Sequence, residues 1–230
     1  VDLMYSLIHQ QVDAIVLVPI DSKALVQPVV EAVRKGVPVI NIDIRLDTQL
    51  LEQAGVEVAF VGPDNFAAAY EVGKLLDKKL RNEDKVAIIE GLAAADNAQQ
   101  RKRGFIKAIE EKGLRLVASE PADWETEKAA EVFQAMWMRY PDLKAVYCSN
   151  DAMALGVLQQ MQEKNCYLPV VGFDNDAVMK EFLSTGKLVA TADIFSSQMA
   201  VRGIEFALDV LEGKIENRGV HSTAYEIIKQ

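Results

Sequence analysis

Short apolar segments alternate with longer amphipathic segments along this chain. The apolar segments are four to six residues long and rich in Val, Ile and Ala, which is typical of strands buried in a sheet. They are Asp13–Val18, Val37–Ile42, Val58–Val61, Val86–Glu90, Arg115–Ser119, Ala145–Cys148, Val170–Phe173, Leu188–Ala192 and Tyr225–Ile228. The predicted helices between them include Ala24–Lys35, Phe66–Lys79, Asn97–Lys112, Glu127–Arg139 and Ala152–Glu163. Because the two kinds alternate, the pattern predicts an α/β fold of βαβ units with mostly parallel sheets.

Three segments interrupt this alternation and predict crossings between two lobes. Val61–Asn65 follows a strand without a helical pattern and precedes a new helix, and the other two are Asp193–Ser196 and Asn217–Thr223. They predict two Rossmann-like (flavodoxin-like) lobes joined by a three-segment hinge, with residues 1–62 plus 195–219 in one lobe and residues 63–194 plus 220–230 in the other. A cleft between two lobes is a favoured place for a small-molecule site.

Charge and composition exclude several classes of protein. The net charge of −9 argues against a nucleic-acid surface, which needs clustered Lys and Arg, and the basic run Arg101–Arg103 lies within a predicted helix. The longest apolar run, Ala14–Val18, is too short to cross a bilayer. Glycine-rich phosphate loops and nucleophile elbows do not occur, and two scattered histidines are too few for a metal site. We therefore expect no enzyme, no cofactor and no metal, with Cys148 and Cys166 as two buried thiols.

Polar residues stand directly after two of the predicted strands. Asn150 and Asp151 follow Ala145–Cys148, and Asp174 follows Val170–Phe173. In open α/β sheets, ligands bind outside the carboxyl ends of the strands, so these residues are candidates for a binding site. Asn and Asp are also good helix caps, and one member of the Asn150-Asp151 pair is expected to cap the helix that follows. The other is then available to a ligand.

Asn97 and Arg101 are four residues apart on a predicted helix and therefore share one face. Arg101 offers five fixed donors and Asn97 offers a donor and an acceptor, which suits neighbouring hydroxyl groups. The alternative is a helix cap at Asp96 or Asn97 with Arg101 in a surface ion pair. Asp43, which ends another strand, either accepts hydroxyl hydrogens or is an ordinary turn residue.

Two aromatic residues also stand at predicted strand ends. Trp124 follows Pro121-Ala122-Asp123, and Phe173 precedes Asp174. An aromatic face in such a place can pack against the apolar C–H face of a sugar ring, and core packing is the alternative role.

As a set, several motifs resemble the ribose-binding-protein family, the type I periplasmic sugar-binding proteins of ABC transporters. The resemblance extends over the whole chain at nearly constant spacing. The matching stretches are Val12–Pro19, Gly36–Ile40, Arg101-Lys102-Arg103-Gly104-Phe105, Pro121-Ala122-Asp123-Trp124, Asn150-Asp151-Ala152-Met153-Ala154-Leu155-Gly156, Val171-Gly172-Phe173-Asp174 and Gly186-Lys187-Leu188-Val189-Ala190-Thr191.

The resemblance implies a set of ligand contacts. Asp43, Arg101, Asn150 and Asp174 would bond sugar hydroxyls, Trp124 and Phe173 would supply stacking walls, and Asn97 matches a polar contact of hexose binders. Asp151 is then expected to be the helix cap. The chain departs from the ribose pattern in two places. Ribose binders usually have Arg directly after the Asp43 position, whereas this chain has Ile44 there and Arg45 next. They have Gln where this chain has Ile194, which follows Asp193. Both departures fall among the residues implied to set specificity, so Arg45 and Asp193 join the candidate set.

The family resemblance also implies a function and partners. A protein of this kind closes on one monosaccharide and presents it to a membrane permease of an ABC transporter or to a chemoreceptor, in the periplasm or outside the cell, with or without a lipid anchor. The alternatives are the effector domain of a LacI-type transcription regulator and the sugar-sensing domain of a membrane receptor or kinase. Relative to the family, the chain is expected to begin after a first β-α-β unit, so that the N-terminal lobe is incomplete, and it shows no signal segment.

Overall fold

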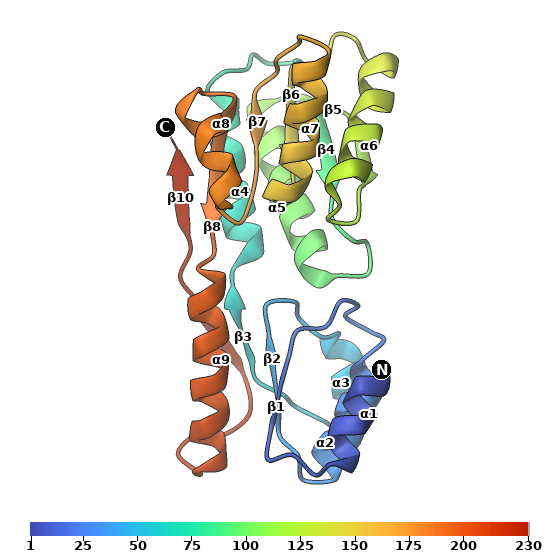
Figure 1. The fold of residues 1–230 in the computed structure, drawn as a ribbon, viewed down its shortest axis with the longest axis vertical. Coiled ribbons are helices and arrows are strands. Elements are labelled where there is room, and N and C mark those ends of the chain that lie inside the picture. The colour runs from blue at the N-terminus through green and yellow to red at the C-terminus, as the bar shows by residue number, and fades with distance from the viewer. Residues whose placement is uncertain (230) are drawn as a thin grey trace. The chain divides into compact units, whose positions relative to one another are not determined.

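The computed structural model describes residues 1–229, which form two compact units (Figure 1). Unit 1 comprises Val1–Pro63, Ala94–Asn97 and Phe195–Ala224. Unit 2 comprises Asp64–Ala93, Ala98–Ile194 and the residues from Tyr225 on. The main chain passes from one unit to the other after residues 63, 194 and 224, and residues 94–97 form a short additional segment of unit 1.

Unit 1 is built on a parallel four-stranded sheet with the strand order β1-β2-β3-β9. Its strands are β1 (Ile15–Leu17), β2 (Val39–Ile42), β3 (Phe60–Pro63) and β9 (Val220–Thr223), and its helices are α1 (Asp2–His9), α2 (Val26–Arg34), α3 (Thr48–Gln53) and α9 (Ser196–Leu211). Val39 packs in one apolar core with residues of α1, α2 and α3. Ile40 and Ile42 pack in a second core with Ala207 of α9. Helices therefore cover both faces of β2, which explains its continuous apolar sequence.

Unit 2 is built on a six-stranded sheet with the strand order β10-β8-β7-β6-β4-β5. The strands are β4 (Lys85–Glu90), β5 (Arg115–Pro121), β6 (Ala145–Cys148), β7 (Val170–Val171), β8 (Leu188–Asp193) and β10 (Glu226–Lys229). All neighbouring pairs are parallel except β10 and β8, which pair antiparallel. The carboxyl ends of the five parallel strands therefore meet at one edge of the sheet, where ligands of such folds bind.

Helices pack on the sheet of unit 2. They are α4 (Asn65–Asp77), α5 (Asp96–Lys112), α6 (Thr126–Arg139), α7 (Asp151–Glu163), the short 3-10 helix η1 (Ala177–Met179) and α8 (Lys180–Ser184). Residues of α6, α7 and α8 share one core with β4, β6, β7 and β8. On α5, Phe105 packs against Tyr147 of β6 with 5.4 Å between ring centroids. Gly104 allows α5 to approach α4, because a Cβ at this position would collide with the carbonyl oxygen of Phe66.

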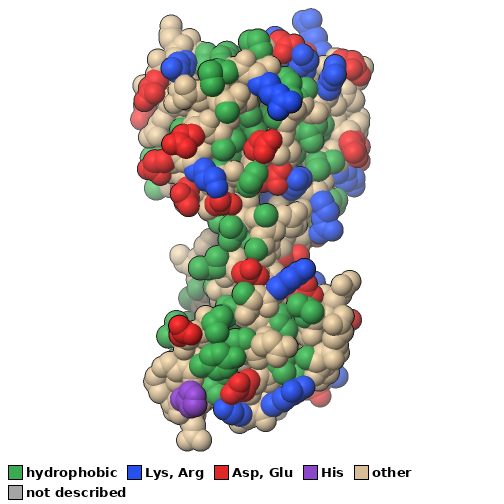
Figure 2. Space-filling model, turned by 90° about the vertical axis from the view of Figure 1, so that its right-hand side faces the viewer, with side chains coloured by type: hydrophobic (Ala, Val, Ile, Leu, Met, Phe, Trp, Pro, Cys, Tyr) green, Lys and Arg blue, Asp and Glu red, His purple; other side chains and the backbone are tan. Residues whose placement is uncertain are grey.

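The structure differs from the sequence-based expectations in several places. The predicted lobe boundary places residues 220–223 in the second lobe. These residues form β9, which pairs with β3 of unit 1. The last strand, β10, is antiparallel to its neighbour. Cys148 is a fully buried free thiol, but Cys166, which is also free, is only half-buried. Acidic and basic side chains are interspersed on the face drawn in Figure 2. None of the helices among residues 1–229 is long and apolar enough to cross a bilayer.

Candidate functional site

Backbone strain is concentrated in the loops that follow the strands. Among residues 1–229, nine non-glycine residues have positive φ, a conformation that is unfavourable for side chains with a Cβ. Three of them, Gln11, Glu83 and Asn165, lie at helix ends or in a turn before a strand. The other six follow β2, β5, β7 and β8 and are Asp43, Asp123, Trp124, Asp174, Asn175 and Phe195. Such strain is typical of ligand-binding loops, where the surrounding contacts hold the backbone in place.

Arg101 of α5 is a buried polar side chain with fixed partners at this edge of unit 2. It is 3% exposed, its Nε donates to Asn65 Oδ1 at 2.8 Å, and its Nη1 donates to the carbonyl oxygen of Ser149 at 2.9 Å. Nη1 also lies 3.5 Å from Asp174 Oδ1, which makes an ion pair. A buried guanidinium with fixed partners presents its charge and donors in one orientation.

Two aromatic rings face the Arg101 guanidinium. Its carbon lies 3.7 Å from the centroid of Phe173 and 5.5 Å from that of Trp124. Phe173 is fully buried, so the prediction that it is a stacking wall for a ligand is wrong. Its ring supports Arg101 by a cation–π contact, and burial is the reason for the different role.

Trp124 is half-buried and packs over the end of β4. A Cβ on Gly91, the residue after that strand, would collide with the six-membered ring of the indole. The loop before α6 is held further by an ion pair between Asp123 and Lys128. Trp124 therefore has a defined position beside Arg101, and its stacking role stays a prediction.

We expect a Gly91→Ala substitution to displace the Trp124 indole, because the added methyl group occupies the space of the ring. The fluorescence emission maximum of Trp124 should shift, measured in a Trp137→Phe background so that Trp124 is the only reporter. Ala at Gly55, where φ is 68° and a Cβ has nothing within 4 Å, strains the backbone without touching the indole and serves as the control. An unchanged emission maximum in the Gly91 variant would contradict the packing described for Trp124.

Asn97 lies one turn before Arg101 on α5 and carries an unsatisfied acceptor. The side chain is 5% exposed, and its Oδ1 has no hydrogen-bond partner among the described residues. A buried polar atom without a partner is unfavourable by about 1–3 kcal/mol, and native proteins seldom keep one without a reason. A hydroxyl group of a bound molecule would supply the missing donor.

Asn150, and not Asp151, is the cap of α7. The Asn150 Oδ1 accepts from the backbone N–H of Met153 at 2.9 Å. Asp151 is fully buried and accepts from the hydroxyl of Thr191 and from the backbone N–H of Asp176. The expected cap at Asp151 is therefore wrong. Asn150 remains half-exposed, and its side-chain amide nitrogen is available to a ligand while Oδ1 caps the helix.

The pKa of Asp151 is raised to about 7, chiefly by burial and also by the nearby Asp176 carboxylate. The hydrogen bonds from Asp176 N–H and Thr191 act in the opposite direction but do not offset the loss of solvation. Cys148, at the end of β6, remains a neutral thiol because burial raises its pKa well above the usual value. Asp151 is therefore an internal group that changes charge near neutral pH.

Asp193 ends β8 on the same edge of the unit 2 sheet. Its Oδ2 accepts from the side-chain amide of Asn175 at 2.9 Å. This contact links the loop after β7, which carries Asp174, to the end of β8. The structure thus brings Arg101, Trp124, Asn150, Asp174 and Asp193 to one edge of unit 2.

Asp43 and Arg45 occupy the equivalent place in unit 1, after β2. Asp43 has φ 63°, and Arg45 lies over the Phe60 ring at 5.6 Å. The buried side chain of Asn41 shapes this loop, because its Nδ2 donates to the carbonyl oxygen of Ile44 and its Oδ1 accepts from the N–H of Leu46, both at 2.8 Å. Asn41 is not among the site residues predicted from the sequence. The sequence feature that points to Asn41 is a polar residue inside an otherwise apolar strand.

A second missed residue is Asn65, which holds the Arg101 guanidinium from the start of α4. A third is Glu90, a buried carboxylate at the end of β4 that accepts from Ser119 and pairs with Lys102 at 2.7 Å. The partners of Asn65 and Glu90 come from other elements of the chain, so no local sequence pattern predicts these contacts.

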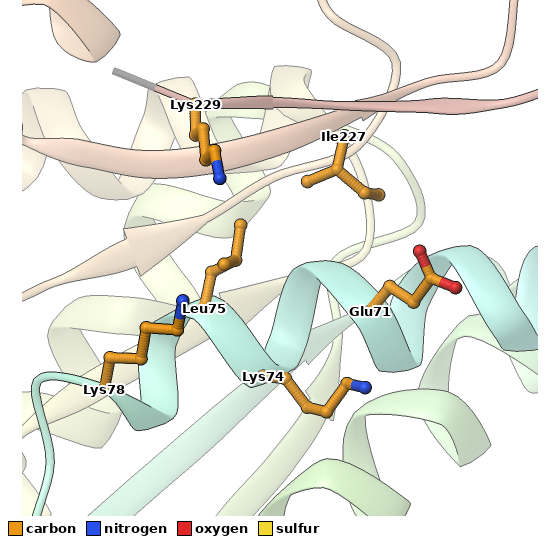
Figure 3. Close-up of a pocket in the computed structure, with 6 residues that line it drawn as sticks. All are labelled: Glu71, Lys74, Leu75, Lys78, Ile227 and Lys229. Carbon is orange, nitrogen blue, oxygen red and sulfur yellow. The ribbon is translucent and has the colours of Figure 1, made fainter.

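Unit 2 has a depression of about 490 Å³ between α4 and β10, and Figure 3 draws the residues that line it. None of the predicted site residues lines it. Its Glu71 already accepts from the Tyr225 hydroxyl at 3.0 Å, and Lys74 points away from β10 and lies over the Tyr70 ring. Its charged side chains are exposed, so this depression lacks the fixed, buried polar groups that surround Arg101. Its lining residues are Glu71, Lys74, Leu75, Lys78, Ile227 and Lys229.

The sequence profile of the family described as periplasmic binding protein domain matches residues 1–215. The chain belongs to this family. The D-ribose/D-allose-binding protein of Pseudomonas aeruginosa is 43% identical over 222 residues, which cover 94% of this chain and 70% of that protein. The D-allose-binding periplasmic protein of Escherichia coli is 34% identical, with 90% of this chain and 68% of that protein covered.

Solved structures of periplasmic binding proteins are similar over nearly the whole chain. An ABC transporter solute-binding protein from Burkholderia multivorans has a TM-score of 0.94 and 40% identity, covering 99% of this chain and 81% of that one. Another, from Actinobacillus succinogenes with bound D-allose, has a TM-score of 0.92 and 31% identity, covering 99% and 82%. The fold class predicted from the sequence, that of type I periplasmic binding proteins, is confirmed.

Proposed function

We propose that the chain binds a monosaccharide or similar polyol and delivers it to the permease of an ABC transporter, in the periplasm or outside the cell. The similar proteins named above bind D-ribose or D-allose, or hold D-allose in a solved structure, and this supports a sugar of that size as the ligand. The absence of phosphate loops and nucleophile elbows from the sequence supports binding without chemistry.

The chemistry of the edge of unit 2 suits a polyhydroxylated ligand. Arg101 can only donate hydrogen bonds and the Asp174 carboxylate can only accept them, while each sugar hydroxyl does both. A charged partner strengthens such bonds, and each contributes about 1.5–3 kcal/mol net. A handful of them is enough for a dissociation constant near 1 μM, which corresponds to about 8 kcal/mol.

Each candidate residue has a proposed role. Arg101 donates to ring or hydroxyl oxygens, Asp174 and Asp193 accept from hydroxyls, and the Asn150 amide donates. Trp124 packs against the apolar face of the sugar ring. In unit 1, Asp43 is proposed to accept a hydrogen bond from a sugar hydroxyl and Arg45 is proposed to donate one.

The unsatisfied acceptor of Asn97 is the observation that carries the proposal, because it indicates a donor that the described chain does not supply. Isothermal titration calorimetry with a panel of pentoses, hexoses, deoxysugars and polyols, led by D-allose and D-ribose, tests it. The proposal expects saturable binding of at least one sugar with a dissociation constant of about 1 μM or lower. No heat with any compound, from protein shown to be folded, would refute it.

Replacing Asn97 with leucine separates a ligand contact from a structural role. Leucine removes a buried polar group that has no partner for Oδ1, so the free energy of unfolding without sugar should stay equal or rise. Sugar affinity should fall about 10-fold, because the ligand hydroxyl loses its acceptor. Chemical denaturation and calorimetry measure the two quantities. A loss of stability at unchanged affinity would show that Asn97 serves the fold instead.

A further inference from the structure

The loop between β7 and η1 carries Asp174 in a strained backbone conformation. Asp174 has φ 110° and Asn175 has φ 59°, and both side chains have a Cβ that disfavours these angles. The carboxylate of Asp174 nevertheless has a definite position, since its Oδ1 lies 3.5 Å from Arg101 Nη1. Contacts elsewhere must hold the loop in this conformation.

Two fully buried side chains, Asp151 and Thr191, supply those contacts. The Thr191 hydroxyl donates to the Asp151 carboxylate, at 2.9 Å from Oδ1 and 3.0 Å from Oδ2. Asp151 Oδ2 also accepts from the N–H of Asp176 at 2.9 Å, and Thr191 Oγ1 accepts from the N–H of Asn175 at 3.2 Å. The pair therefore fixes two successive amides directly after Asp174.

The main chain of Asp151 adds a third contact to the same loop. Its N–H donates to the carbonyl oxygen of Phe173 at 2.7 Å. Gly172 leaves room for the arrangement, because a Cβ there would collide with Asp151 Oδ1. The residues on both sides of Asp174 are thus tied to the first turn of α7 and to β8, which are far apart in sequence.

We propose that Asp151 and Thr191 act together as positioning residues, which hold Asp174 against Arg101 and so set the affinity of the site without touching the ligand. The role of Asp174 as a ligand contact rests on the proposed function. The holding of the loop by Asp151 and Thr191 does not. Without the Thr191 hydroxyl, Asn175 N–H loses its acceptor and Asp151 loses a donor. The strained segment can then relax and withdraw the Asp174 carboxylate from Arg101.

The matched variants Thr191→Val and Thr191→Ser test this proposal. Valine keeps the shape and removes the hydroxyl, and serine keeps the hydroxyl and removes a methyl group. With the sugar that wild-type protein binds most tightly, we expect the dissociation constant to rise about 10-fold or more for Thr191→Val and to stay within about 3-fold for Thr191→Ser. Equal affinities of Thr191→Val and wild type would overturn the proposal.

Amide hydrogen exchange without sugar provides a second readout that does not depend on the proposed function. The amides of Asn175 and Asp176 should exchange about 10-fold faster or more in Thr191→Val, while amides of β4 and β6 keep their protection. Unchanged exchange at these two amides would overturn the proposal even if affinity falls. If wild-type protein binds no sugar, the proposed function fails. The exchange result then still decides whether Asp151 and Thr191 hold the loop.

If Thr191→Val does not fold, Asp151→Ala takes its place. Alanine removes both carboxylate oxygens, so the Thr191 hydroxyl and the N–H of Asp176 lose their acceptor. The same loss of affinity and the same local increase in exchange are expected, and wild-type behaviour in both measurements would overturn the proposal.

Discussion

An Arg101→Met variant is expected to lose sugar affinity by about 100-fold or more and to be less stable than wild type by about 3–5 kcal/mol. The affinity falls because a charged donor at the site is removed. The stability falls because Asn65 Oδ1 and the Ser149 carbonyl lose their buried donor, and Asp174 loses a paired cation. Calorimetry measures the affinity below the unfolding temperature, and chemical denaturation measures the stability.

The matched control is Arg103→Met, two residues further on the same helix. Arg103 is exposed, so its variant should bind sugar and unfold like wild type. An Arg101→Lys variant keeps the positive charge but lacks the planar guanidinium. Its sugar affinity and its stability should lie between those of Arg101→Met and Arg103→Met. Wild-type affinity in Arg101→Met would show that the guanidinium does not take part in binding.

An Asp151→Asn variant is expected to change how stability depends on pH. The pKa of Asp151 is about 7 in the folded protein against an ordinary value of 3.8, because the carboxyl group is buried. Since the folded value is the higher one, proton binding favours the folded state. This contribution is fully present below about pH 4 and is lost as the pH rises through about 7.

The free energy of unfolding of wild type relative to Asp151→Asn should therefore be about 2–3 kcal/mol larger at pH 5 than at pH 8, so that wild type is relatively more stable at pH 5. Denaturant unfolding at the two pH values measures it. The control is Glu163→Gln at the end of the same helix, where the same carboxyl-to-amide change is made on an exposed side chain. A parallel pH dependence of wild type and Asp151→Asn would show that Asp151 titrates as it does in the unfolded chain.

The sequence predicts the fold well where both faces of a strand are buried. β4 and β6 are continuous apolar runs, because helices pack on both sides of the sheet. β9 was missed because its residues are mostly exposed, and only its pairing with β3 makes it a strand. β7 is shorter than expected, ending at Val171.

The candidate site was predicted in part, and the limit is physical. The four-residue spacing of Asn97 and Arg101 on one helix is a local pattern, and the structure places both side chains in buried positions on α5. Asn150 and Asp151 are both good caps, so the local pattern cannot decide between them. The choice depends on Thr191, which is forty residues away in the chain and accommodates the Asp151 carboxylate. Phe173 was assigned wrongly for the same reason, since its partner Arg101 comes from another element.

A crystal structure of the protein with the sugar that binds most tightly in calorimetry tests the central claim most directly. The claim predicts sugar oxygens about 2.7–3.2 Å from Arg101, Asp174 and Asn97 Oδ1, with Trp124 against the ring. A sugar bound elsewhere, for example in the depression between α4 and β10, with these four side chains making no contact to it, would contradict the claim.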